Sequence, residues 1–300
     1  MTTASSTTPL PLAGRFSVLA ADIKISHTLF AMPWALFATF LAAGGWPKVG
    51  QIALIIACMV TARTVAMAAN RLMDARLDAL NPRTARRAIP SGQLSTRFMA
   101  GVLVVCAATF IVATAGFLAY GNPLPLYCSV PVLAYVCGYP LMKRFTRFCH
   151  FYLGLALGLA PLCAWLAIKG SLDLPPLVMT GVVLLWTAGF DIIYACQDYE
   201  SDVATGVFSV PAKVGIANAL WIARMTHLAC MGLLMALSQS SPLLGPIFYA
   251  AVGIAIVLLV IEHSVVRPND LSKVGLAFFT INGVISLVIG LLGIIDVLLG

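Results

Sequence analysis

Acidic and amide side chains recur at one-turn spacing in a polar stretch of this sequence, NRLMDARLDALNPRTARRAIPSG, residues 70–92. Asn70, Asp74 and Asp78 stand four positions apart. A helix turns by about 100° per residue, so these side chains would form one stripe. Carboxylates stacked in this way repel each other unless something cationic lies between them. The stripe therefore indicates a binding site for a cation.

A second acidic stretch, DIIYACQDYESD at residues 191–202, repeats the pattern. Asp191, Tyr194, Asp198 and Asp202 lie within one face if this segment is helical. Two such helix ends could supply the oxygen ligands of Mg²⁺, which completes its octahedron with water and phosphate oxygens. Magnesium bound to a diphosphate would make it a better leaving group. The plainer interpretation, solvated charged helix ends, is disfavoured because solvated faces seldom repeat acids at this spacing in two places.

Basic and aromatic residues accompany the acidic stretches. Five arginines lie within residues 70–92 and could bind the same anion. Arg63 lies on the face of Asn70 but deeper in an apolar run, where an arginine is costly unless it lines a polar cavity or pairs with an anion. Its planar guanidinium could hold a substrate carboxylate, or it could pair with a nearby carbonyl or acid. Tyr139 and Lys143 are one turn apart and, taken alone, are typical of a membrane interface.

The histidines and cysteines show no metal-ligand spacing. The eight cysteines are scattered, mostly within apolar runs, and we expect neither disulfides nor a thiolate metal site. Each of the four histidines is expected to make local hydrogen bonds. His27 is the one best suited to line a cavity.

The elements that must position these residues are membrane helices. Of the 300 residues, 61% are hydrophobic and 10% are charged, and the mean hydropathy is +0.98. Apolar runs of about 20 residues, enough to cross about 30 Å of hydrocarbon, recur along the chain. The sequence predicts an all-α, polytopic membrane protein with a single domain, residues 23–300. The net charge of +7 is attributed to basic cytoplasmic loops rather than to nucleic-acid binding.

Nine membrane spans are expected, separated by short segments rich in Gly, Pro and Ser. They lie near residues 24–44, 50–72, 96–118, 123–142, 151–169, 175–195, 214–237, 244–263 and 274–297. Basic residues gather on one side if the N-terminus is inside, so the N-terminus and the acidic stretches are predicted to face the cytoplasm, with a bacterial inner membrane as the expected location. Residues 1–22 are expected to form a disordered cytoplasmic tail.

The motifs resemble those of the UbiA family of intramembrane aromatic prenyltransferases, over essentially the whole chain. Two acidic motifs, an arginine element and a YxxxK element of that family are matched. The matches are Asn70, Asp74 and Asp78 (NxxxDxxxD); Asp191, Tyr194, Asp198 and Asp202 (second acidic motif); Thr84, Arg87, Pro90 and Gly92 (TxxRxxPxG, with Ala88 where proline is common); and Tyr139 and Lys143 (YxxxK). Longer segments, among them IKISHTLFAMPWAL and DLSKVGLAFFTINGVIS, are similar to the 4-hydroxybenzoate polyprenyltransferase-like branch linked to futalosine-route menaquinone biosynthesis.

The resemblance implies about nine transmembrane helices around a central cavity, with the second and sixth spans facing each other. It implies Mg²⁺-dependent transfer of a polyprenyl chain from an allylic prenyl diphosphate to a carboxylated phenolic aromatic, 4-hydroxybenzoate or 1,4-dihydroxy-6-naphthoate, in quinone biosynthesis. The implied roles are metal binding by Asp74, Asp78, Asp198 and Asp202; substrate binding by Asn70, Arg63, Arg87, Tyr139, Lys143 and Tyr194; and catalysis by Asp191, Asp74 and Asp198. Within these roles, Arg63 would hold the acceptor carboxylate and Asp191 would lie near the acceptor ring.

Three alternatives remain open from the sequence. Within the family, the acceptor could be haem, chlorophyllide or homogentisate, although Arg63 favours a small carboxylated aromatic. A cation-coupled transporter is disfavoured because transporters place their ion-binding groups near the bilayer midplane. A membrane phosphatidyltransferase is disfavoured because the glycine- and arginine-containing half of its motif is absent. No protein partner is indicated.

Overall fold

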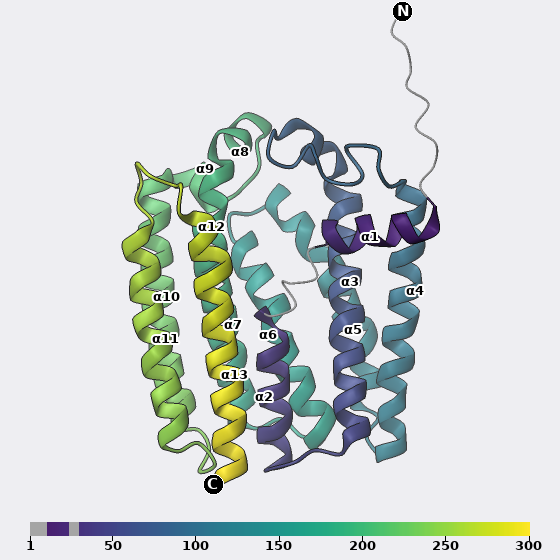
Figure 1. Ribbon diagram of the computed structural model, residues 1–300, viewed down its shortest axis with the longest axis vertical. Coiled ribbons are helices and arrows are strands. Elements are labelled where there is room, and N and C mark those ends of the chain that lie inside the picture. Colours follow the sequence, from purple (N-terminus) through teal and green to yellow (C-terminus); the bar gives the residue numbers. More distant parts are fainter. Residues whose placement is uncertain (1–10, 24–29) are drawn as a thin grey trace, which may run out of the picture.

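The computed structural model describes residues 11–23 and 30–300, which form helices, turns and loops without a β-strand (Figure 1). The α-helices are α1 (Leu12–Asp22), α2 (Met32–Ala43), α3 (Val49–Leu80), α4 (Thr96–Ala115), α5 (Leu124–Gly138), α6 (Cys149–Lys169), α7 (Leu174–Ala195), α8 (Tyr199–Thr205), α9 (Val210–Val214), α10 (Ile216–Ser238), α11 (Pro246–Val265), α12 (Val274–Leu276) and α13 (Asn282–Leu299). The 3₁₀ segments are η2 (Gly116–Tyr120), η3 (Tyr139–Arg144) and η4 (Cys196–Asp198), and a π-helical turn, η5 (Ala277–Ile281), precedes α13.

Eight helices in the described part of the chain are long and apolar enough to cross a membrane, and the shorter apolar helix α2 lies beside them. This agrees with the prediction of about nine spans. The first predicted span, 24–44, overlaps α2, and its first residues lie outside the described ranges. The second, 50–72, lies within α3, which continues to Leu80 and so contains the helical stripe predicted for Asn70, Asp74 and Asp78; Asp74 and Asp78 are buried. The 32 residues of α3 span about 48 Å at 1.5 Å per residue, more than the hydrocarbon thickness of about 30 Å.

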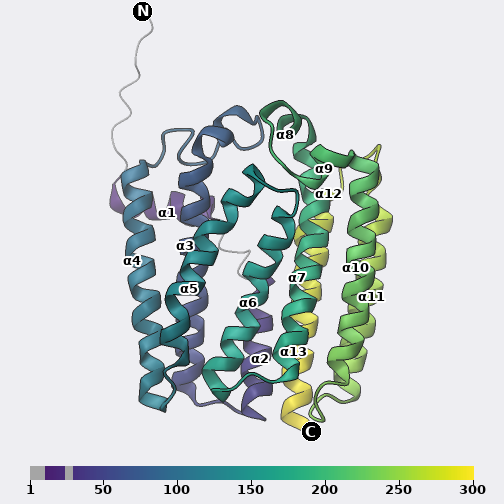
Figure 2. The ribbon, with the colours of Figure 1, turned by 180° about the vertical axis from the view of Figure 1, so that it is seen from behind.

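The long helices stand side by side in one bundle (Figures 1 and 2). Helix α6 packs against α7 and α2, α10 packs on α7, α11 and α2 pack on α13, and α3 packs on α4. The main core lies between α2, α7, α11 and α13, where Trp34, Trp186, Phe248 and Ile289 are at most 1% exposed. The short elements α1, α8 and α9 lie at one end of this bundle, together with the loop of residues 81–95. We call this end of the bundle, with α1, α8, α9 and the 81–95 loop, the site end, and the opposite end of the bundle the far end.

Two glycines allow α6 to approach α7 closely. A Cβ at Gly158 would lie 2.8 Å from the Thr180 carbonyl oxygen, and one at Gly154 would overlap the Leu184 carbonyl group. The Thr180 hydroxyl also donates a hydrogen bond of 3.2 Å to the Gly158 carbonyl oxygen. Small residues spaced four apart permit this kind of contact between membrane helices. The contact fixes the start of α6 beside the end of α7, which carries the second acidic stretch.

Helix α1 lies across the bundle at the site end rather than along it (Figure 1). The prediction of a disordered tail to residue 22 is therefore wrong for residues 12–22. Leu19 and Ile23 are buried in a small core with Ala68 of α3 and Ala88 of the 81–95 loop, and this packing orders the segment. Residues 1–10 lie outside the described ranges, as does His27, the histidine expected to line a cavity.

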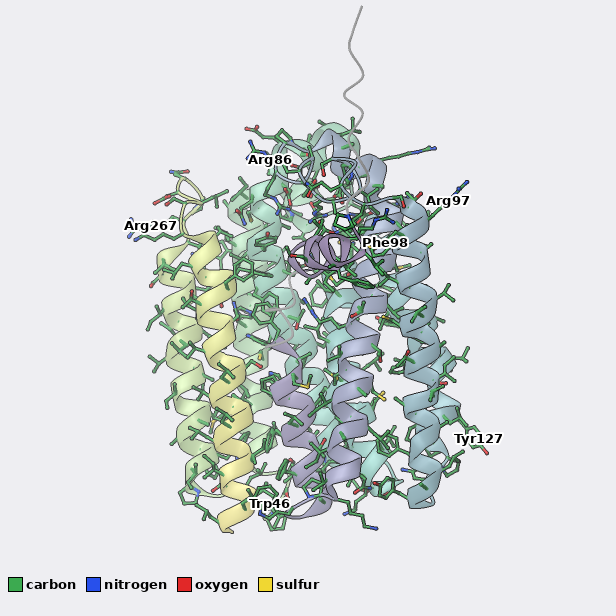
Figure 3. The ribbon with its side chains drawn as sticks, turned by 45° about the vertical axis from the view of Figure 1, so that its right-hand side comes forward. Trp46, Arg86, Arg97, Phe98, Tyr127 and Arg267 are labelled. Carbon is green, nitrogen blue, oxygen red and sulfur yellow. The ribbon has the colours of Figure 1, made fainter. Side chains whose placement is uncertain are left out.

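Basic side chains gather at the site end of the molecule. Figure 3 shows Arg86, Arg97 and Arg267 there, and Trp46 and Tyr127 near the far end. All eight cysteines are free thiols.

Candidate active site

A polar cavity lies at the site end, between α3, η3, the start of α6 and the end of α7. The side chains that line it carry both signs of charge. Eight of the predicted site residues are among them: Asn70, Arg87, Tyr139, Lys143, Asp191, Tyr194, Asp198 and Asp202. The two acidic stretches, more than a hundred residues apart in sequence, thus meet at one cavity.

The first acidic stretch is held by cations from two other elements. Lys143 Nζ of η3 lies 2.6 Å from Asp74 Oδ2, which also accepts a 2.8 Å hydrogen bond from the Asn70 amide. Arg87 Nη1 of the 81–95 loop donates to both oxygens of Asp78, at 2.7 and 2.8 Å. Asp74 and Asp78 do not line the cavity directly, and they reach it through Lys143 and Arg87.

The second acidic stretch is tied to the same loop by Arg83. Its Nε and Nη2 donate to the two oxygens of Asp198 at 2.8 and 2.5 Å, and its Nη1 donates to the Tyr194 hydroxyl at 2.8 Å. Asn81 adds a 2.8 Å hydrogen bond to Asp198. Burial alone would lower the pKa of Arg83, but its hydrogen bonds with Asp198 and the charge of that carboxylate outweigh burial and raise the pKa. Arg83 is therefore a permanent positive charge that joins the loop after α3 to the second acidic stretch.

Asp191 is held by a histidine of the neighbouring helix. His150 Nδ1 lies 2.7 Å from Asp191 Oδ2, and the Val210 backbone N–H donates to His150 Nε2 at 3.2 Å. Because Nε2 accepts a hydrogen bond, the proton of the neutral ring is on Nδ1 and is donated to Asp191. Asp191 therefore faces the polar cavity as an oriented acceptor.

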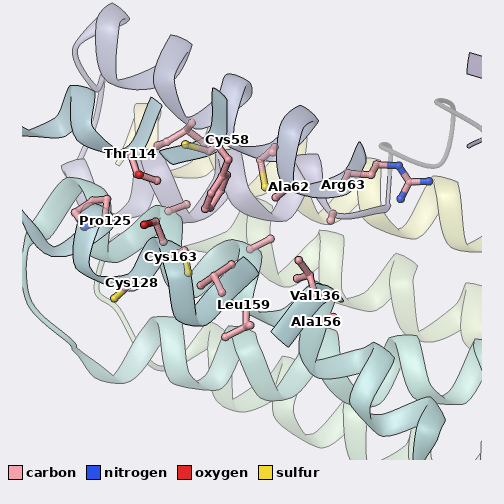
Figure 4. Close-up of a pocket in the computed structure, with 18 of the residues that line it drawn as sticks. Cys58, Ala62, Arg63, Thr114, Pro125, Cys128, Val136, Ala156, Leu159 and Cys163 are labelled. Carbon is pink, nitrogen blue, oxygen red and sulfur yellow. The ribbon is translucent and has the colours of Figure 1, made fainter. Parts of the chain in front are cut away.

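An apolar cavity adjoins the polar one. It runs between α3, α5 and α6 from Arg63 and Val136 toward Thr114 and Pro125, which lie near the far end (Figure 4). Met67, Tyr139 and Leu153 line both cavities. Arg63 lines the apolar cavity and not the polar one. The pair of cavities therefore combines a charged end with a long apolar end.

Some residues that the structure places at the site carried no clear signal in the sequence. Arg83 was only one of five arginines in its stretch, and His150 has no informative spacing. Arg71 lines the polar cavity, and Arg144 lies 3.8 Å from Asp74 Oδ1. Each of these side chains is recognisable only once distant segments are brought together.

The carboxylates fit a divalent cation that arrives with a phosphate. Within residues 11–23 and 30–300, no three Asp, Glu, His or Cys side chains converge as a metal held by protein alone would need. Mg²⁺ often takes only one or two carboxylates and completes its shell with water and substrate phosphate. Oδ1 of Asp74 is buried and accepts no hydrogen bond from the described residues, with Arg144 Nη2 3.8 Å away, so its lone pairs could serve such a cation.

The fold and the site define a membrane-embedded protein whose charged cavity continues into an apolar one, an arrangement suited to an amphipathic anion. The chain belongs to the UbiA prenyltransferase family, whose sequence pattern matches residues 31–284, and it is a prenyltransferase.

Named relatives and solved structures agree with this assignment. The chain is 30% identical to a 4-hydroxybenzoate solanesyltransferase of Synechocystis sp. over 248 residues, 80% of each chain. It is 28% identical to a 4-hydroxybenzoate octaprenyltransferase of Vibrio parahaemolyticus, over 92% of this chain and 95% of the relative. The apo structure of a UbiA homolog from Aeropyrum pernix superposes with a TM-score of 0.82 at 28% identity, covering 91% of this chain and 99% of that one. A UbiA homolog from Archaeoglobus fulgidus, bound to GPP and Mg²⁺, shares the fold with a TM-score of 0.69 at 18% identity, covering 92% of this chain and 99% of that one.

Proposed function

We propose that this protein transfers a polyprenyl chain from an allylic prenyl diphosphate to a carboxylated phenolic aromatic, 4-hydroxybenzoate or 1,4-dihydroxy-6-naphthoate, in quinone biosynthesis. The observation that carries the proposal is the junction of the charged and apolar cavities at Met67, Tyr139 and Leu153. A prenyl diphosphate has the same division into a charged head and an apolar chain. The relatives that act on 4-hydroxybenzoate support the choice of acceptor.

The diphosphate would occupy the polar cavity. Asp74, Asp78, Asp198 and Asp202 would hold Mg²⁺, which would neutralise charge on the departing pyrophosphate. Lys143, Arg83 and Arg87 would turn from the carboxylates toward the phosphate oxygens, as charge-assisted donors. Asn70 and Tyr139, which also line this cavity, would complete the binding of the diphosphate. Fixed donors aimed at a leaving anion lower the barrier because they need no reorganisation during the reaction.

The acceptor would lie between Asp191 and Arg63. The guanidinium of Arg63 would bind its carboxylate, and Asp191, held by His150, would orient its phenolic hydroxyl. When the allylic C–O bond breaks, the pyrophosphate keeps the electron pair. The ring carbon ortho to the hydroxyl then forms the new C–C bond, and that carbon loses its proton. Tyr194 and the 81–95 loop would cover the site and exclude water, which would otherwise capture the allylic cation.

The orientation in the membrane follows from the same charges. Twelve of the 18 lysines and arginines lie at the site end of the bundle, in residues 71–97, 143–147 and 267–273 and at Lys213. We infer that the site end faces the cytoplasm. A bacterial inner membrane is the proposed location, which gives a cytoplasmic aromatic acid direct access to the polar cavity.

The test is a transfer assay with purified protein in lipid nanodiscs, Mg²⁺ and a prenyl diphosphate. Each of the two acids is supplied in turn, and a phenol in which methyl replaces the carboxylate serves as the comparison. We expect prenylated product and pyrophosphate with at least one acid, and a loss of product with the methyl analogue. Absence of pyrophosphate release with both acids would remove the proposal.

The role of Arg63 is tested in the same assay. Arg63→Ala should raise the acceptor KM about 10- to 100-fold, the worth of a charge-assisted hydrogen bond, and leave the donor KM unchanged. Arg224→Ala is the matched control because Arg224, on α10, stacks on Trp221 and lines neither cavity. An unchanged acceptor KM in Arg63→Ala would show that Arg63 does not bind the acceptor carboxylate.

A further inference from the structure

Asp22, the last residue of α1, is joined to the site without lining it. Its Oδ2 accepts a 2.8 Å hydrogen bond from Arg71 Nε, and its backbone carbonyl accepts another, also 2.8 Å, from Arg71 Nη2. Its Oδ1 accepts a 2.9 Å hydrogen bond from the Ala88 backbone N–H. The two side chains of this ion pair are only 7% and 4% exposed. One carboxylate thus joins three elements: α1, α3 and the 81–95 loop.

Through Arg71, Asp22 reaches the first acidic stretch. Arg71 Nη1 donates a 2.9 Å hydrogen bond to Asn70 Oδ1, and the Asn70 amide nitrogen donates to Asp74. The contacts form a continuous series from Asp22 through Arg71 and Asn70 to Asp74. The orientation of the Asn70 amide is therefore set by a residue outside the cavity.

Arg71 would have another partner if Asp22 were absent. Asp74 lies three positions further along the same helix, where side chains are neighbours. A buried guanidinium without its carboxylate is strongly unfavourable and takes the nearest available anion. Asp22 therefore keeps Arg71 away from Asp74 and leaves that carboxylate to Lys143 and the substrate.

Through Ala88, the same carboxylate anchors the loop that carries Arg83 and Arg87. Ala88 is 2% exposed and follows Arg87, which binds Asp78. Thr84 of this loop donates a 3.0 Å hydrogen bond to the Asp78 carbonyl oxygen. With Asp22 at one side and Asp78 at the other, the loop is fixed over the cavity.

We propose that Asp22 is a positioning residue for the diphosphate and metal half of the active site, acting through Arg71 and through the loop at Ala88. The inference rests on the proposed function for its substrate, and it adds a residue of α1 to the machinery. Among the described residues, Asp22 hydrogen-bonds to Arg71 and Ala88 and to none of Arg63, Asp191 and His150 in the acceptor half of the site. We therefore expect Asp22 to affect mainly the donor and Mg²⁺.

The test compares Asp22→Asn with wild type in nanodiscs, because asparagine keeps the shape and an acceptor oxygen. We expect the donor KM and the Mg²⁺ concentration for half-activation to rise about tenfold or more, the usual effect of losing a group that supports a ligand-binding side chain. The acceptor KM should stay within about twofold of wild type. Asp270→Asn is the matched control, since Asp270 is an exposed acid at the same end that pairs locally with Ser272.

A double variant separates positioning from general destabilisation. If Asp22 acts through Arg71, Asp22→Asn combined with Arg71→Gln should be no worse than Arg71→Gln alone, because the two residues act as a unit. The inference is overturned if Asp22→Asn leaves the donor and Mg²⁺ parameters unchanged, raises both substrate KM values equally, or adds fully to Arg71→Gln. Failure of the proposed function would appear as a wild-type protein without transfer activity. Failure of this inference would appear as an active wild-type protein whose donor and Mg²⁺ parameters do not respond to Asp22→Asn.

Discussion

Asp74 and Asp78 on α3, and Asp198 after α7, each form an ion pair with a cation from another structural element. Lys143 of η3 pairs with Asp74, and arginines of the 81–95 loop pair with Asp78 and Asp198. Since these carboxylates are nearly buried, leaving one unpaired would be costly. The cations thus stabilise the site without substrate, and under the proposed function they would bind phosphate oxygens once a prenyl diphosphate and Mg²⁺ are present.

Arg83 makes three hydrogen bonds to the second acidic stretch, and the prediction at the residue scale concerns its removal. Arg83→Gln should lower kcat/KM for the prenyl diphosphate about 10- to 100-fold, because a bidentate, charge-assisted contact is lost. Arg86→Gln, an exposed arginine of the same loop, is the control and should stay within about twofold of wild type. Steady-state kinetics with varied donor would measure both, and equal values for the two variants would count against a role for Arg83.

The predicted motif residues could be found from sequence because their spacing is local. Asn70, Asp74 and Asp78 repeat once per helical turn, so their common stripe survives in the structure. Arg83 and His150 could not be found in this way. Arg83 binds a carboxylate 115 positions away and His150 one 41 positions away, and neither separation leaves a periodic trace.

At the scale of elements, apolar periodicity and length were enough to predict the membrane spans from the sequence. They were not enough to predict the short helices and the helix ends outside those spans. The membrane span was expected to end near residue 72, with the acidic stripe of Asn70, Asp74 and Asp78 continuing as a helix, and α3 does run on to Leu80. Helix α1 was not expected at all, because an 11-residue helix is marginal alone and here depends on packing against α3 and the 81–95 loop. The sequence did not predict α1 because this helix is stabilised by tertiary contacts at the site end.

The element-scale prediction concerns the close approach of α6 and α7. Gly154→Ala should lower the midpoint of thermal unfolding by several degrees, because the added methyl group forces the helices apart at a cost of about 1–3 kcal/mol. Gly253→Ala on α11 is the matched control, because a Cβ there meets nothing within 4 Å, and a helical alanine in place of glycine is neutral or stabilising. Tryptophan fluorescence at a fixed heating rate in one detergent would compare them. An equal midpoint for both variants would show that the contact is not tight.

At the scale of the whole molecule, the bundle sets a charged cavity at one end beside an apolar cavity that extends toward the other. The general arrangement was implied by the family resemblance, including the meeting of the second and sixth spans, here α3 and α7. The resemblance did not imply how the predicted residues are divided between the two cavities. Arg63 shares a helical face with Asn70, yet its depth places it on the apolar cavity, a consequence of packing that helical spacing alone does not contain.

The molecular-scale prediction is that the apolar cavity holds the prenyl chain. Cys163→Phe narrows this cavity and should reduce kcat/KM for a long-chain donor about tenfold more than for a geranyl donor. Cys106→Phe on α4 is the matched control, because Cys106 lines neither cavity. A competition assay with both donors, read by mass spectrometry, gives the ratio directly. Equal losses with the two donors would place the chain elsewhere.

The central claim is that carboxylates from α3 and from the end of α7 act on one diphosphate. The most direct test is the rate of pyrophosphate release in nanodiscs for Asp74→Asn and Asp198→Asn, at saturating donor and acceptor and over a range of Mg²⁺ concentrations. Asp173→Asn, in the loop before α7 at the far end, is the control. We predict that both site variants lose at least about 100-fold in rate while the control does not. A wild-type rate in either Asp74→Asn or Asp198→Asn would contradict the claim.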